Sequence, residues 1–246
     1  MFRGVLAGVT GMRAQLLRQD VIANNLANAA TPGYRQDTVA FSTYLESYIY
    51  RCDQQGVSYL GDLAPAMVLY ETKTIHVPGP IETTGNPLDI TLSPRTYLSV
   101  EAPGGVRYTR RGDLSLTADG YLEVGGYRVL GRSGQVRIPD LSQPVHIGQD
   151  GTIFCGDEEV DKLAIVGFED ESVLRKEGSC LFAADEGAAR GVEASVLTGC
   201  LERSSVDAVT EMVHLVDAFR AYEASQRAIQ AQDEATAEAV NRVGKV

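Results

Sequence analysis

The sequence contains no run of about 18 consecutive apolar residues, the length that a membrane-spanning helix needs. We therefore expect no integral membrane span. The first ten residues also lack the continuous apolar segment and the small-residue cleavage site of a secretory signal. If the protein leaves the cytoplasm, we expect export without a cleaved signal peptide.

Basic residues are in the minority. The chain has 22 Lys and Arg against 33 Asp and Glu, a formal net charge of −11. Binding to a phosphate backbone requires Lys and Arg clustered on one face, where they release counterions. The sequence therefore does not favour nucleic acid as a partner.

Cysteine pairs and catalytic motifs are also missing. The four cysteines form no Cys-x-x-Cys pair, so we expect no zinc site or redox motif. Buried small apolar side chains are the simpler interpretation, and a disulfide between Cys155 and Cys180 is the alternative. His76, His146 and His214 lie in different regions, and no nucleophile elbow, His-Glu-x-x-His or phosphate-binding loop accompanies them. We expect no enzymatic activity, metal or cofactor.

What the sequence does contain is an apolar pattern at each end, with alternating spacings of three and four. That alternation is typical of a coiled-coil seam. The first seam consists of Phe2, Val5, Val9, Met12, Leu16, Gln19, Ala23 and Leu26. The second consists of Met212, Leu215, Phe219, Tyr222, Gln226, Ile229, Asp233, Thr236, Val240 and Val243. The pattern predicts helices over residues 2–28 and from just after 205 to 244, completed by neighbouring subunits.

Residues that end or begin a helix stand at the expected places. Asn28 can act as a C-cap, and the residues Thr31-Pro32-Gly33 cannot easily continue a helix. Gly33 permits a positive φ angle. At the other end, Ser204-Ser205 offers hydroxyl groups that can cap the first free N–H groups of the last helix.

The middle of the chain has a different period. Residues 35–80 show no sustained period, and we expect a connecting segment with a short helix over 41–50 and a strand near 67–76. From residue 81 to about 197, ten short runs of period two alternate with turn residues, which predicts an all-β sandwich or partly closed barrel. Asp-Gly and Gly-Gly steps predict the hairpin turns. These turns are Ala118-Asp119-Gly120, Gly125-Gly126 and Gln149-Asp150-Gly151.

Together these patterns predict an α+β fold, in which the N- and C-terminal helices pack as a coiled-coil-like domain beside a central all-β domain. The expected domains are an N-terminal helical assembly segment (1–34), a connecting segment (35–80), a central β domain (81–200) and a C-terminal helical assembly segment (201–246).

Three groups of motifs resemble one known family. The segment Val21–Tyr34, with Asn24-Asn25-Leu26 and Thr31-Pro32-Gly33-Tyr34, closely resembles the N-terminal signature of the bacterial flagellar axial proteins, which include rod, hook and hook-associated subunits. Residues 199–207, 220–224 and 229–234 resemble the C-terminal signature of that family, and 108–114, 119–122 and 131–139 its central β domain. The chain departs from the family pattern at 92–97 and at Ser205, where Asn is usual.

The resemblance implies a structural subunit of the basal-body rod, of proximal or distal type. Such a subunit polymerises with copies of itself and with other rod and hook proteins into a helical tube that transmits torque and forms the export channel. It reaches the periplasm or cell envelope through the flagellar type III export apparatus. A hook-type or hook-associated subunit, and a glycan-binding β domain on a coiled-coil stalk, are the alternatives.

The resemblance and the seams together suggest an assembly interface at both ends. Its residues are Asn24, Asn25, Leu26, Asn28, Thr31, Pro32, Gly33, Tyr34, Arg220, Tyr222, Glu223, Gln226, Ile229, Gln230, Gln232 and Asp233. Asn disfavours helix interiors, so buried amides that fix register between subunits would explain its presence. The alternatives are a fraying helix end for the Asn residues, a solvated face for the polar residues of the last helix, ion pairs within that helix, and core packing for the two Tyr residues.

Overall fold

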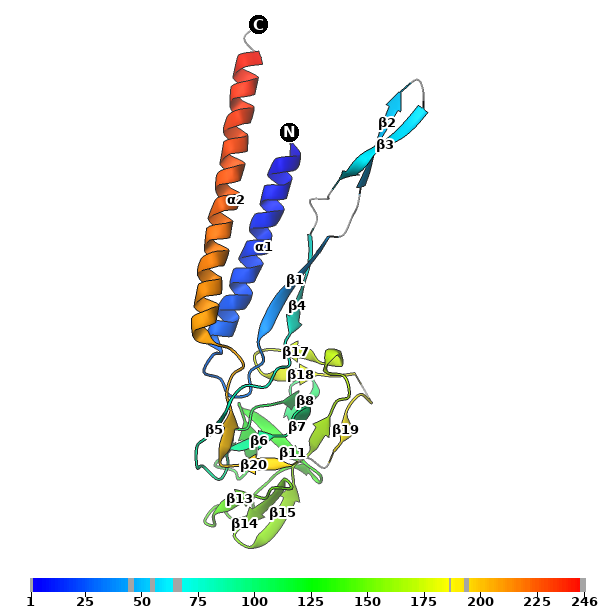
Figure 1. The fold of residues 1–246 in the computed structure, drawn as a ribbon. Helices are drawn as coiled ribbons and strands as arrows, with labels where there is room; N and C mark the ends of the chain where they lie inside the picture. Colours follow the sequence, from blue (N-terminus) through cyan, green and yellow to red (C-terminus); the bar gives the residue numbers. More distant parts are fainter. Residues whose placement is uncertain are drawn as a thin grey trace. The chain divides into compact units, whose positions relative to one another are not determined.

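The computed structural model describes residues 2–43, 47–53, 56–63, 68–185, 187–192 and 195–243 (Figure 1). The chain forms two compact units. The first, here called the terminal unit, comprises residues 1–26, 37–73 and 208–246; the second, here called the β unit, comprises residues 27–36 and 74–207. The domain limits predicted from the sequence stay a prediction.

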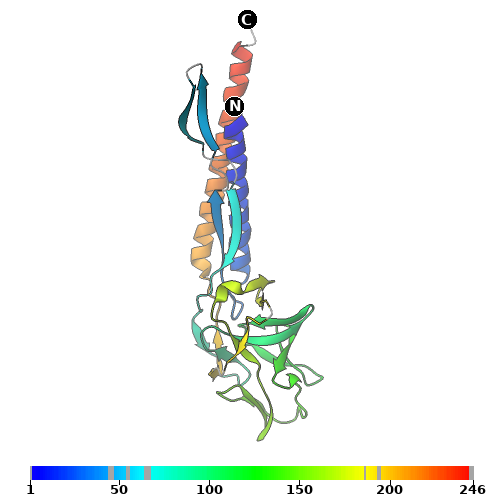
Figure 2. The same cartoon turned by 90° about the vertical axis from the view of Figure 1, so that its right-hand side faces the viewer.

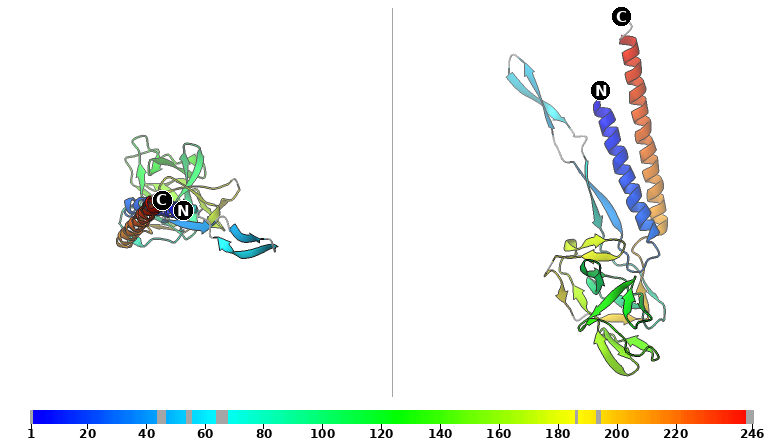
Figure 3. Two further views of the ribbon diagram at one scale, coloured as in Figure 1. Left: turned by 90° about the horizontal axis from the view of Figure 1, so that it is seen from above. Right: turned by 180° about the vertical axis from the view of Figure 1, so that it is seen from behind.

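The described residues of the terminal unit form both long helices and four strands. Helices α1 (Phe2–Ala27) and α2 (Ala208–Val243) run antiparallel, side by side, as the views in Figures 1 and 2 agree. Strand β1 (Asp37–Thr43) pairs with β4 (Val68–Thr74), and β2 (Ser47–Asp53) with β3 (Gly56–Leu63), as two separate two-stranded sheets (Figure 3). Both predicted helices are confirmed.

The expectations for the connecting segment are confirmed only in part. The strand expected near 67–76 is confirmed by β4. The helix expected over 41–50 is wrong for 41–43 and 47–50, which belong to β1 and β2, whereas 44–46 lie outside the described residues. Aromatic and β-branched residues such as Tyr48 and Ile49 favour strands.

Inside the chain the two helices approach each other closely at glycine residues of α1. A Cβ atom placed on Gly8 would lie 2.6 Å from Ile229 Cγ1, and one on Gly11 would lie 3.8 Å from Ser225 Oγ. Ile22 of α1 and Ala218 of α2 are buried. Of these residues, Ile229 belongs to the predicted apolar seams.

Several large apolar residues of the seams are exposed in the described chain. Val9 is 48% exposed and Phe219 is 51% exposed, and Leu16 and Met212 are exposed to a similar degree. A coiled-coil core would bury these side chains. The predicted coiled-coil-like packing of the two helices is therefore wrong for the described chain, because several large seam side chains remain exposed.

The β unit is built around a central antiparallel sheet. Its main path has the order β17-β18-β8-β7-β11-β10-β9, with β12 beside β11, β16 beside β7 and β19 beside β16. These strands are β7 (Thr96–Ala102), β8 (Gly105–Thr109), β9 (Leu114–Leu116), β10 (Leu122–Val124), β11 (Tyr127–Gly131), β12 (Gly134–Gln135), β16 (Ile165–Gly167), β17 (Arg175–Glu177), β18 (Leu181–Ala183) and β19 (Arg190–Gly191).

Smaller sheets complete the β unit. Strands β13 (Val145–Ile147), β14 (Thr152–Cys155) and β15 (Glu158–Lys162) form a three-stranded sheet, β6 (Ile90–Leu92) pairs with β20 (Val196–Thr198), and β5 (Ile81–Thr83) pairs with β21 (Cys200–Glu202). A short 3₁₀ helix, η1, spans Glu171–Val173. Strands β15 and β17, at the ends of their sheets, consist mostly of charged residues.

Two apolar clusters form most of the core. One gathers the inward residues of the central and small sheets, including Leu98, Val100 and Ile153. The other contains Tyr97 and Phe182, whose rings pack edge to face at 5.6 Å. Burial alternates in strands such as β10 and β13, where alternate residues face the same side, whereas β6 and the first five residues of β7 are buried throughout.

The three predicted hairpin turns are confirmed. Gly120, Gly125, Gly126 and Gly151 all have positive φ angles between 58° and 84°, the conformation that tight turns require. Most predicted strands are present, but the run at 136–138 is not a strand, although Val136 and Ile138 are buried.

The predicted fold class is wrong. The described residues contain 21 strands and two long helices, so the fold is mainly β, with strands also in the segment expected to connect. The cysteine alternative is also decided: Cys155 and Cys180 are buried free thiols in different clusters, and they form no disulfide.

Candidate functional site

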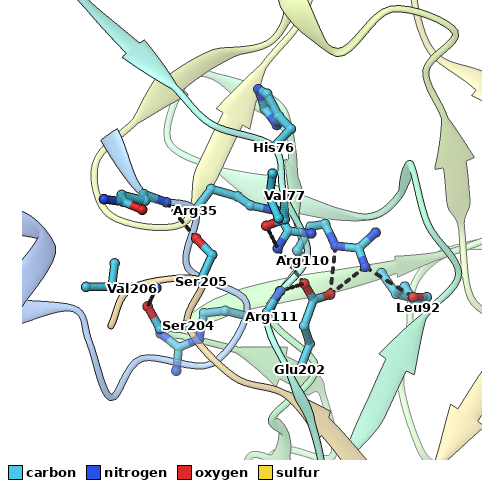
Figure 4. A network of polar contacts seen from close by, with 12 residues as sticks. Arg35, His76, Val77, Leu92, Arg110, Arg111, Glu202, Ser204, Ser205 and Val206 are labelled. Carbon is cyan, nitrogen blue, oxygen red and sulfur yellow. Dashed lines mark hydrogen bonds and ion pairs between the residues drawn. The ribbon is translucent and has the colours of Figure 1, made fainter. Parts of the chain in front are cut away.

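A buried carboxylate lies between two buried guanidinium groups in the β unit. Arg35 Nη1 donates to Glu202 Oε1 at 2.5 Å, and Arg110 donates to Glu202 Oε2 from Nε at 3.0 Å and from Nη2 at 2.5 Å (Figure 4). All three side chains are at most 3% exposed. We call these three residues the charge cluster.

Each member of the charge cluster follows or ends an element that holds it in place. Arg35 follows the turn at Gly33, Arg110 directly follows β8, and Glu202 is the last residue of β21. Gly33 has a φ angle of 66°, and its N–H donates to the carbonyl oxygen of Glu202 at 2.8 Å. A Cβ atom on Gly33 would lie 2.5 Å from the carbonyl carbon and oxygen of Arg110. The turn therefore requires glycine.

Backbone groups satisfy most of the remaining polar atoms. Arg110 also donates to the carbonyl oxygens of Leu92, Ser93 and Thr96, at 2.7 to 3.1 Å. Arg35 Nη1 donates to the carbonyl of Val77 at 2.9 Å. Burial lowers the pKa of Arg35, and the neighbouring carboxylate of Glu202 opposes that effect.

Tyr34 anchors the end of the first signature. Its ring is fully buried against Cys180 and Val206. Lys176 Nζ lies 3.8 Å from the ring centroid and donates to the carbonyl of Arg35 at 2.6 Å. Burial also raises the pKa of the Cys180 thiol, so the thiol stays protonated.

The two terminal signatures bind each other directly. The N–H of Ser205 donates to the carbonyl of Tyr34 at 3.1 Å, and the N–H of Gln36 donates to Ser205 Oγ at 3.0 Å. Ser205, where the family usually has Asn, thus supplies a side-chain acceptor to the segment after α1.

Asn25, a predicted assembly residue, is held by hydrogen bonds inside its own chain. Its side chain is 1% exposed. Its Nδ2 donates to the carbonyl of Asp37 at 2.8 Å and to Glu211 Oε2 at 3.3 Å, and its Oδ1 accepts from the N–H of Asp37 at 3.0 Å. Asn25 therefore joins α1, β1 and α2 within the terminal unit.

The other predicted residues of the first signature lie around the end of α1. Asn24 is exposed, and Leu26, Asn28, Thr31 and Pro32 are partly buried. The carbonyl of Asn28 accepts from the N–H of Thr31 at 3.1 Å, which closes a turn just after the helix. This contact agrees with a capping role for Asn28.

The predicted residues on α2 are mostly exposed. This holds for Arg220, Glu223, Gln226, Gln230, Gln232 and Asp233, whereas Tyr222 and Ile229 are partly buried. Glu223 and Arg227 form an ion pair at 3.6 Å within the helix. Ile229 faces α1 at Gly8, which lies outside the first signature.

Sequence reasoning missed the charge cluster as a unit. Arg110 and Glu202 stood within the recognised motifs and Arg35 directly followed one, but their pairing depends on contacts across 92 and 167 positions. One sequence signal could have indicated the charge cluster: each of the three motif regions has a charged residue beside a buried strand or turn.

The first three turns of α2 carry a group of exposed apolar residues. Val209, Met212, Val213, Val216 and Phe219 are all exposed, at helical spacings that place them along one side. Apolar patches of this kind on a protein are typical of protein–protein contacts. The two terminal signatures are joined by hydrogen bonds, and α2 carries an exposed apolar stripe. Together these features are typical of a structural subunit of an assembly. None of the helices within the described residues is long and apolar enough to cross a membrane.

Comparison with known proteins agrees with this class. Residues 6–35 match the family described as "Flagella basal body rod protein", residues 92–155 match "Flagellar hook protein FlgE/F/G D1 domain", and residues 197–242 match "Flagellar basal body rod FlgEFG protein C-terminal". The chain is 30% identical to the flagellar basal-body rod protein FlgG of Bacillus subtilis, over 98% of this chain and 99% of that protein. It is 30% identical to FlgF of Escherichia coli over 91% and 92%, and 29% identical to FlgF of Caulobacter vibrioides over 92% of each chain.

The chain belongs to the family of flagellar basal-body rod proteins. It is a structural subunit of the rod in the flagellar basal body, where it assembles with other axial components. The predicted family and function are thereby confirmed. The charge cluster joins residues from or beside all three matched regions.

Proposed function

We propose that this rod subunit polymerises, with copies of itself and with other rod and hook proteins, through the outward faces of its two terminal helices. The observation that carries the proposal is the exposed apolar stripe of α2, from Val209 to Phe219. Val9 and Leu16 give α1 a similar exposed stripe. Each stripe can bury its apolar surface against a helix of an adjacent subunit.

Contacts between two different stripes are heterologous, and heterologous contacts that do not close into a ring generate a helical tube. In such a tube the exposed polar residues of the helices would select partners and register. Asn24, Gln226, Gln230 and Asp233 are exposed and suit that role. Tyr222 and Ile229 would contribute packing where the helices meet.

The tube would transmit torque and enclose the export channel, and the chain would act without enzymatic activity. Its relatives are structural rod proteins. We further propose that the chain crosses the cell envelope unfolded through the flagellar type III export apparatus. The resemblance of both termini to the axial signatures supports this route.

Replacement of Phe219 by Ser tests the polymerisation surface. About half of this side chain is still exposed, so contact with a neighbour would gain up to roughly 1.5 kcal/mol. Phe219→Ser should therefore weaken association by about tenfold, measured as the subunit concentration at which tubes form in sedimentation and electron microscopy. Val106→Ser, at a site 49% exposed on β8, is the matched control and should assemble normally. Assembly of Phe219→Ser at the wild-type concentration would contradict the proposal.

A further inference from the structure

The charge cluster joins residues that enter the chain at very different times during synthesis. Arg35 precedes Glu202 by 167 positions, and Arg110 precedes it by 92. Nearly all the core strands of the β unit, from β5 to β20, also precede Glu202. A chain that ends before residue 202 thus contains both arginines and most of the core, but not their carboxylate.

The two arginines have no substitute for that carboxylate. Among the described residues, Glu202 is the one acidic side chain that bonds to either guanidinium; the other acceptors are backbone carbonyls. Arg35 Nε is buried and has no acceptor within the described part of the chain. Without Glu202, neither buried guanidinium of the folded β unit would have a carboxylate partner among the described residues. Burial of unpaired charge is among the most costly events in folding.

We propose that Glu202 makes folding of the β unit conditional on the C-terminal signature. Until residue 202 is in place, burial of Arg35 and Arg110 opposes the packing of the core, and the incomplete chain stays unfolded. Once Glu202 binds both arginines, the same residue also accepts two hydrogen bonds from the backbone. Its carbonyl accepts from the N–H of Gly33 at 2.8 Å, and its carboxylate accepts from the N–H of Gly79 at 3.1 Å.

This conditional role explains why the core contains ions at all. Replacement of a buried ion triad by apolar residues is often neutral or stabilising, so the triad adds little to the stability of the complete chain. Removal of a single partner, in contrast, is strongly destabilising. Glu202 is the last residue of the triad in the sequence. The cost of burying unpaired charge therefore falls on the incomplete chain, which lacks Glu202, and not on the complete one. The inference holds whether or not the helical faces polymerise.

A set of full-length variants tests the proposal. The readouts are the urea dependence of unfolding and the hydrogen exchange of β7 and β11. Glu202→Ala keeps the backbone of β21 and removes the carboxylate, so it should raise the unfolding equilibrium constant by at least about a hundredfold. In the background Arg35→Met/Arg110→Met, Glu202 is itself the unpaired buried charge, so Glu202→Ala should lower the unfolding constant or leave it unchanged.

This reversal of sign distinguishes charge balance from packing. An equal cost of Glu202→Ala in both backgrounds would overturn the proposal, because the residue would then act through packing or through β21. If Glu202→Ala does not fold, the triple variant decides: a folded triple variant supports the proposal and an unfolded one overturns it. Glu82→Ala is the control, since Glu82 pairs with Arg203 at 3.6 Å on the surface, and should change the unfolding constant less than about fivefold.

Discussion

Replacement of Gly33 by Ala should destabilise the β unit more than a positive φ angle alone explains. At a φ angle of 66°, the added Cβ costs about 1–2 kcal/mol. That Cβ would also lie 2.5 Å from the carbonyl of Arg110, which is backbone and cannot rotate away. A shift of well-packed structure adds about 1–3 kcal/mol. The expected loss is therefore about 2–5 kcal/mol of unfolding free energy.

Gly178→Ala is the matched control for this substitution. Gly178 has a φ angle of 69°, and apart from its chain neighbours no atom of the described residues would lie within 4 Å of the added Cβ, so only the conformational cost of about 1–2 kcal/mol applies. Urea unfolding followed by circular dichroism, together with hydrogen exchange of β7, measures both variants. A Gly33→Ala protein within about 0.5 kcal/mol of Gly178→Ala would refute the reasoning, because the close approach of the two backbones would then carry no cost.

Two further predictions concern buried and exposed polar groups. Asn25→Ala should lower the stability of the terminal unit by about 1–3 kcal/mol in thermal unfolding, since both backbone groups of Asp37 lose a partner; exposed Asn24→Ala should have little effect, and equal losses would argue against the contact. Hydrogen bonds from Thr152 lower the pKa of Asp150 to about 2. Its stabilising effect should be complete above pH of about 4 and disappear as the pH falls towards about 2. Urea midpoints of wild type and Asp150→Asn should therefore converge at low pH; a constant difference would disprove this.

The sequence predicted those features that depend on neighbouring residues. Helix α1 was expected over 2–28 and spans Phe2–Ala27, because the apolar period and the residues Thr31-Pro32-Gly33 both act locally. The Gly125-Gly126 turn was likewise found from two adjacent residues. Such signals need no knowledge of what lies across the core.

Features that depend on distant contacts were not predictable in this way. The heptad pattern identified apolar positions such as Val9 and Phe219, but it could not show that these stay exposed while Ile229 of the seam packs against Gly8, a residue outside it. For the same reason, Asn25 was expected to contact neighbouring subunits, whereas its amide also bonds within its own chain. A period reports which side of a helix is apolar, and not what covers it.

The charged composition of β15 and β17 affects how subunits can contact one another in a polymer. Exposed strand edges are templates for pairing with other chains, and charged side chains on an edge discourage that pairing. β15 carries Glu158, Glu159, Asp161 and Lys162, and β17 consists of Arg175, Lys176 and Glu177. These charged edges disfavour strand pairing between the sheets of adjacent subunits in the rod.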